Sequence, residues 1–222
     1  MIWVAALLLV GCTHNDDSTS VDEPSGANYT ASIDDEITRV YMDENLALHY
    51  NASDAISLFS TTKNSKYVFI GKQGDTSGEF AKEGSQSVSG ASLGKSYAVY
   101  PYNRAVAITE QGEISTSLTS EQNYVENSVA KGANMMVAVT TSESDRHLSF
   151  KNLCSYISVD LYGKDVTLKS LKLKANGGEK IAGIFKLTAT NGSAPVVTPG
   201  SNAVDGITLT FGFSIVNGNI LF

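Results

Sequence analysis

The chain has few basic residues, few cysteines and no long hydrophobic run. Sixteen Lys and Arg residues are outnumbered by 23 Asp and Glu residues, which gives a formal net charge of -7. An acidic protein repels nucleic acid and anionic lipid surfaces, so electrostatic capture of either partner is disfavoured. The 222 residues, 42% of them hydrophobic, are nevertheless enough to bury at least one full core.

One of the two cysteines, Cys12, follows an uncharged apolar run over residues 2–8 and the small residue Gly11. The run is shorter than the roughly 20 residues that span a bilayer, and its length and ending are typical of an export signal. The order Leu, Val, Gly, Cys at positions 9–12 resembles the bacterial lipobox, although no Lys or Arg precedes the run. It implies that residues 1–11 are a lipoprotein signal peptide and that Cys12 carries diacylglycerol, whose two acyl chains form a stable anchor, together with palmitate.

The other cysteine, Cys154, has no partner in the chain if Cys12 carries lipid. An exported protein of this kind must fold without a disulfide. Cys154 lies inside an apolar strand pattern, which favours an inert buried thiol over a reactive one.

Residues 12–31 are polar and acidic and contain hardly an apolar side chain. Such a segment cannot offset the entropy lost on ordering, so we predict a flexible tether. Asp16 and Asp17 resemble the acidic signal that sends lipoproteins of the Bacteroides group to the outer face of the outer membrane. A solvated acidic linker is the alternative interpretation.

Helical periodicity over ten residues or more is also missing. Instead, β-branched and aromatic residues form short runs between Ser, Thr, Gly and Asn, which predicts an all-β fold with the strand spacing of a β-sandwich. We expect this domain to cover residues 32–210. The clearest expected features are strands at 55–59, 67–70, 97–102 and 135–140, a long strand at 148–162 with a bulge near Lys151 and Asn152, a weak strand around Phe80, and a hairpin across Gln111 and Gly112.

Motifs for catalysis, metal binding or cofactor binding are incomplete. Residues 90–94 match the Gly-x-Ser-x-Gly elbow of hydrolases, but a strand is expected after Ser92 and His147 is the only later histidine. The overlapping Gly94-Lys95-Ser96 falls one residue short of a P-loop. Neither His49 nor His147 has a partner at metal-ligand spacing. We therefore expect a protein that is not an enzyme and holds no cofactor or metal, and a hydrolase at Ser92 is the least favoured alternative.

Six segments between about residues 37 and 209 form a pattern that is informative through their order and spacing. They are Ile37 to Arg39, Ser53 to Phe59, Tyr97 to Tyr102, Gln122 with Tyr124, Met136 to Ala138, and Leu148 to Leu153. In combination they resemble the fimbrillin family of Bacteroides and Porphyromonas relatives, the subunits of lipoprotein-derived fimbriae. The resemblance implies a transthyretin-like β-sandwich of about seven or more antiparallel strands.

The resemblance also implies a route of assembly. In that family a protease cuts after an arginine near the domain start, and the groove left by the first strand accepts a strand from another subunit. Arg39 matches the position of that arginine, and an ordinary surface arginine is the alternative. If Arg39 is processed, Ile33 and Ile37 belong to the segment that is lost or displaced. The implied partners are other fimbrial subunits, the outer membrane and a host or bacterial receptor.

The family pattern stops after Leu209, and residues 211–222 form an apolar tail that is either the truncated start of a second domain or the end of a single-domain relative. The functional expectation is a cell-surface lipoprotein of the outer membrane that acts as a structural or accessory subunit of a fimbria and supports adhesion. The alternative is a stationary lipoprotein that binds glycan through Tyr97, Tyr100 and Tyr102. Packing in a core or interface is the other role open to these tyrosines.

Overall fold

The computed structural model describes residues 27–33, 41–42, 48–84, 89–126, 128–130, 132–162, 167–212 and 217–221. Within these ranges the regular elements are all strands, which confirms the predicted all-β fold class. In this part of the chain there is also no helix long and apolar enough to cross a membrane.

Seven strands close into a barrel. They are β1 (Tyr29–Ile33), β4 (Ala55–Thr61), β5 (Ser65–Phe69), β6 (Ser77–Lys82), β7 (Ser92–Tyr100), β11 (Met136–Val139) and β12 (His147–Asn152). Around the ring their order is β1, β12, β11, β7, β4, β5, β6. A closed ring with an odd number of strands cannot be antiparallel at every seam, and here β1 runs parallel to β12 while the other seams are antiparallel. The predicted sandwich of antiparallel strands is corrected accordingly.

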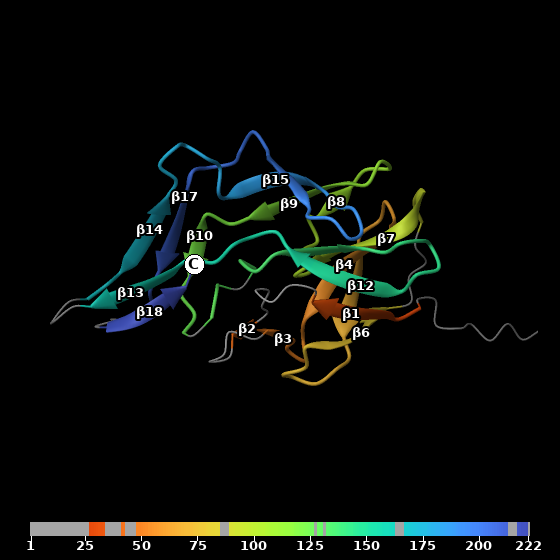
Figure 1. Ribbon diagram of the computed structural model, residues 1–222, viewed down its shortest axis with the longest axis horizontal. Helices are drawn as coiled ribbons and strands as arrows, with labels where there is room; N and C mark the ends of the chain where they lie inside the picture. Colours follow the sequence, from red (N-terminus) through yellow and green to blue (C-terminus); the bar gives the residue numbers. More distant parts are fainter. Residues whose placement is uncertain are drawn as a thin grey trace, which may run out of the picture.

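The remaining strands form smaller sheets. They are β8 (Ala107–Ile108), β9 (Glu113–Leu118), β15 (Gly183–Thr188) and β16 (Val196–Pro199) in one sheet; β10 (Glu121–Asn123), β14 (Ser170–Lys174) and β17 (Gly206–Thr210) in a second; β13 (Ser158–Tyr162) with β18 (Asn217–Leu221); and β2 (Tyr41–Met42) with β3 (Leu48–His49). All of these sheets except β2–β3 are called the second region below. Figure 1 shows β13, β14, β17 and β18 at the opposite end of the molecule from β1, β4 and β6.

The barrel interior is filled largely by aromatic side chains. Tyr50 stacks on Phe69 with ring centroids 4.8 Å apart and meets Phe80 edge-on at 5.5 Å. Ile56 and Leu58 of β4 point into the same core and are fully buried. Such close packing of rings and aliphatic chains provides most of the free energy that stabilises a small domain.

The barrel wall made by β4, β7 and β11 is buried on its outer face as well. Phe59, Val99 and Val137 alternate with the inward residues and pack against Ile114 and Leu187 of the second region. This double burial explains why residues 55–59 could be predicted as a strand, because a strand covered on both faces is apolar at nearly every position.

Two predicted boundaries are wrong. The long strand at 148–162 is two strands, β12 and β13, which are separated by residues 153–157 and belong to different sheets. The change of parity near Lys151 therefore marks the point at which the chain leaves the barrel, not a bulge. The tether predicted for residues 12–31 also ends early, because β1 begins at Tyr29, which is buried in the barrel.

Other strand predictions are confirmed. The hairpin of β8 and β9 turns at Gly112, whose φ of 81° suits glycine, and β6 contains Phe80. The strand predicted at 97–102 is β7, which begins five residues earlier and ends at Tyr100, before Pro101. In the segment predicted as an apolar tail, Phe211 is buried and residues 217–221 pair with β13.

Candidate functional site

The candidate site is the seam that β1 fills between β6 and β12. The strand is the first described element of the chain, and it pairs with both neighbours over its length (Figure 1). Its sequence, Tyr-Thr-Ala-Ser-Ile, alternates so that Tyr29, Ala31 and Ile33 face the barrel core and Thr30 and Ser32 face outward.

The inward side chains complete the barrel core. Tyr29 is 3% exposed, and its hydroxyl lies 2.7 Å from the Oγ of Ser96. Its ring meets Tyr67 edge-on at 5.5 Å. Burial, together with the neighbouring Tyr29, raises the pKa of Tyr67 to about 12, so this phenol stays protonated at neutral pH. Ala31 is 2% exposed, and Ile33 packs against the same core.

The outward side chains are held by the end of β12. The two ring nitrogens of His147 lie 3.1 Å from the Thr30 hydroxyl and 3.0 Å from the Ser32 hydroxyl. The backbone N–H of Thr30 donates to the Arg146 carbonyl at 2.9 Å, and the Arg146 guanidinium lies 5.2 Å from the Tyr29 ring centroid. These contacts fix the register of β1 against β12.

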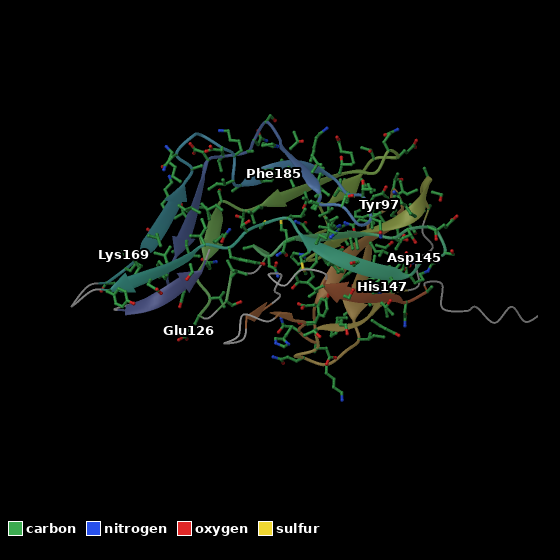
Figure 2. The ribbon with its side chains drawn as sticks, viewed as in Figure 1. Tyr97, Glu126, Asp145, His147, Lys169 and Phe185 are labelled. Carbon is green, nitrogen blue, oxygen red and sulfur yellow. The ribbon has the colours of Figure 1, made fainter. Side chains whose placement is uncertain are left out.

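Asp145 organises the turn that supplies these groups. Its carboxylate accepts hydrogen bonds from the Thr141 and His147 backbone N–H groups, at 2.8 and 2.9 Å, and from the Thr141 hydroxyl at 2.7 Å. These hydrogen bonds, that from the Thr141 backbone foremost, lower the Asp145 pKa to about 2. Figure 2 places Asp145 and His147 close together at one end of β12, with Lys169 at the far end of the molecule.

If β1 left the seam, the exposed strands would have the features of a β-augmentation site. Without β1, the strands β6 and β12 would each present a row of unpaired N–H and C=O groups. Phe80, Leu148 and Phe150, which are fully buried beside β1, would line the opened groove. A row of backbone partners beside an apolar groove is what an added strand recognises.

The predicted processing and lipidation residues, Arg39 and Cys12, lie outside the described residues, as does Ile37. Ile33 is the last residue of β1, and Arg39 follows it by six positions in the sequence. The processing candidate therefore stands just after the strand that fills the seam.

The three tyrosines predicted to stack on a ligand do not share a face. Tyr97 points out of the barrel into the apolar contact with the second region. The Lys95 ammonium lies 5.5 Å from the centroid of the Tyr97 ring. Tyr100 points into the barrel core, because it is three positions away along the strand. Tyr102 lies beyond the strand end and is partly buried.

The other chemistry candidates lie apart from one another. Ser92 is exposed at the start of β7, and its hydroxyl accepts a hydrogen bond from Gly94. The Nδ1 of His49 lies 2.6 Å from the Gly74 carbonyl oxygen. Among the residues that the structure describes, no cluster of His, Cys, Asp and Glu could hold a metal ion. Cys154 is partly buried, and burial raises the pKa of its thiol.

Sequence reasoning missed an open cavity of about 750 Å³ at one end of the barrel. Its walls include Asp54, which precedes β4, Tyr100 and Tyr102 at the end of β7, and Asn134, which precedes β11. Two of the three tyrosines predicted to contact a ligand, Tyr100 and Tyr102, were the signal in the sequence that pointed toward it.

No protein-family model and no curated protein matches this chain. Among solved structures, the chain is similar to a proposed cell adhesion protein from Bacteroides ovatus, with 16% sequence identity and a TM-score of 0.43. The match covers 87% of this chain and 74% of that protein's chain. At this identity and TM-score, the similarity assigns neither a family nor a function to this chain.

Proposed function

We propose that this protein is a surface lipoprotein that acts as a structural or accessory component of a fimbria, is assembled by strand exchange and supports adhesion. The observation that carries the proposal is that β1 fills one seam of a closed barrel and precedes Arg39 in the chain. In this proposal Cys12 anchors the precursor in the outer membrane, and a cut after Arg39 releases the barrel from its anchor.

A cut after Arg39 would change how β1 is held. In the intact chain β1 is covalently continuous with the rest of the barrel, so its effective concentration at the seam is high. After the cut only hydrogen bonds and the burial of Tyr29, Ala31 and Ile33 retain it. A strand from a neighbouring subunit could then compete for the same seam.

The seam also specifies what the incoming strand must look like. The outer positions are large, since Tyr29 is opposite Phe80 and Ile33 is opposite Phe150. The central residue Ala31 is opposite Gly78, and a Cβ built on Gly78 would lie 2.5 Å from the Phe69 ring, which covers this glycine. We therefore expect a donor with the alternating pattern large, small, large and polar residues between.

The test uses the full chain with Arg104→Lys and Arg146→Lys, so that Arg39 is its one arginine. The chain is treated with an arginine-specific protease and offered a fluorescent peptide with the sequence of residues 27–38. We expect mass spectrometry to show a cut after Arg39 and size-exclusion chromatography to show the peptide bound to the barrel.

Two controls make the result specific. Adding Arg39→Lys should abolish both the cut and peptide uptake. A peptide carrying Tyr29→Ser and Ile33→Ser should not bind, because it keeps the backbone but loses the large inward side chains. A chain that is cut after Arg39 and yet excludes the native peptide would contradict strand exchange.

A further inference from the structure

The cavity of about 750 Å³ lies at the barrel end where the chain enters β4 and leaves β7. The volume falls within the range of about 300–1,000 Å³ that is typical of small-molecule sites. β1 does not line this cavity, so the seam and the cavity are separate features.

A carboxylate is held in a fixed orientation on the cavity wall. Asp54 accepts a hydrogen bond from the Tyr100 hydroxyl at 3.2 Å through Oδ1 and from the Asn51 backbone N–H at 2.8 Å through Oδ2. Burial, and then the charge of Asp54, raises the pKa of Tyr100, so its hydroxyl remains a donor. Tyr100 therefore positions the carboxylate and does not offer its ring face to a ligand.

On the same wall, the side-chain nitrogen of a buried asparagine lacks a hydrogen-bond partner. Asn134 is 4% exposed, and its Oδ1 accepts a hydrogen bond from the Tyr156 hydroxyl. Its Nδ2 has no hydrogen-bond partner in the structure. Leaving a buried donor unpaired is unfavourable, so this group is a reason to expect an acceptor atom in the cavity.

The described wall favours an uncharged ligand that both donates and accepts hydrogen bonds. Asp54 is the one charged side chain among the described lining residues, so an anionic ligand is disfavoured there. Asn51 and Gln73 add amides to that of Asn134. Tyr102 adds an aromatic ring, and the Lys66 ammonium lies over one face of it, 5.6 Å from the ring centroid. Sugar hydroxyls can accept from Asn134 and donate to a carboxylate, and sugar rings pack on aromatic faces.

We propose that this cavity binds a short neutral oligosaccharide, with Asp54 and Asn134 as hydrogen-bonding residues and Tyr102 as the aromatic contact. The sequence suggested that Tyr97, Tyr100 and Tyr102 stack on a glycan together. In this proposal only Tyr102 offers its ring to the sugar. It does not depend on strand exchange, and Arg39→Lys should leave it unchanged.

The experiment is a calorimetric titration of the full chain with maltotriose, mannotriose and N-acetylchitotriose. We expect saturable binding of at least one of these probes. Asn134→Asp keeps the oxygen that accepts from Tyr156 and removes the donor, so it should weaken binding about tenfold or more. Tyr102→Ala should weaken it similarly. Tyr162→Ala is the matched control, because Tyr162 is 87% exposed on β13 and does not line the cavity.

If a thermal unfolding scan shows that Asn134→Asp does not fold, the proposal is tested by Tyr102→Ala alone. Tyr102 lies beyond the end of β7, so we expect this variant to fold. The proposal is overturned if none of the three probes binds saturably. It is also overturned if binding is unchanged in the folded variants, or if an uncharged peptide displaces the sugar and binds more tightly.

Discussion

The barrel and the second region bury their apolar residues to different extents. In the barrel core the apolar side chains are buried, with Ile33 of β1 as the partly buried one packed against them. In the second region the cluster around Leu118, Ile207 and Leu209 is bordered by a larger set of partly buried side chains. A cavity of about 330 Å³ with mostly apolar walls also opens there.

The difference teaches what ring closure contributes. Closing a sheet on itself removes its edges and surrounds each inward side chain on all sides. Open sheets of two to four strands leave apolar faces to be covered by neighbouring segments, and Ile184, Val196 and Val197 of β15 and β16 remain exposed in the second region. Burial of the barrel core therefore depends on β1, which closes the ring. The second region leaves apolar side chains partly exposed even when β1 is in place.

Paired substitutions should show the largest difference between the two regions. Phe150→Ala removes a fully buried ring opposite Ile33 and should lower the free energy of unfolding by about 3–5 kcal/mol. Phe185→Ala removes a partly buried ring that lines the second cavity and should cost roughly 1–2 kcal/mol. Urea unfolding of both variants measures the difference, and equal losses would show that the two cores are equally well packed.

The turn that holds β1 should show a smaller, pH-dependent effect. The Asp145 pKa is lowered from 3.8 to about 2, so its stabilising effect is present above pH 4 and is lost as the pH falls toward 2. Asp145→Asn should destabilise the protein by under about 1 kcal/mol at pH 6, because solvent screens a carboxylate near the surface.

Urea unfolding of wild type and Asp145→Asn between pH 6 and pH 2.5 tests this expectation. The two proteins should converge as the pH falls. Glu110→Gln, in an exposed turn, controls for the loss of one negative charge. A difference that grows at low pH would contradict the role assigned to Asp145.

Cys154 should show the smallest effect. Its thiol lines the second cavity and burial raises its pKa, so little thiolate is present at neutral pH. In a Cys12→Ser chain, we expect iodoacetamide to alkylate native Cys154 several-fold more slowly than the urea-unfolded chain at pH 8. Equal rates, followed by mass spectrometry, would mean that the second region exposes this thiol freely.

Strands with long apolar runs could be located from the sequence because burial on both faces leaves a continuous signal. Residues 55–59 and 135–140 are examples. Gly112 marked the turn between β8 and β9 because its positive φ of 81° favours glycine. Strand β1 could not be located, since its five residues include Thr30, Ala31 and Ser32 and their burial depends on pairing with residues more than 100 positions away.

The candidate sites were harder still to predict. The lining of the cavity of about 750 Å³ comes from four separated parts of the chain, so no local spacing reveals it. The orientation of the Asn134 amide, whose Nδ2 lacks a partner, depends on its hydrogen bond to Tyr156, which lies 22 residues later. Three tyrosines close together in sequence suggested one face, but strand alternation separated Tyr97 from Tyr100.

Hydrogen exchange on β6 and β12 tests most directly whether β1 is a replaceable strand. In the chain with Arg39 as its one arginine, amides in residues 77–82 and 147–152 should be protected before the cut and exchange faster once the fragment ending at Arg39 is removed. Adding the peptide of residues 27–38 should restore their protection. Unchanged protection after removal of the fragment, or no recovery with the peptide, would contradict a seam that depends on β1.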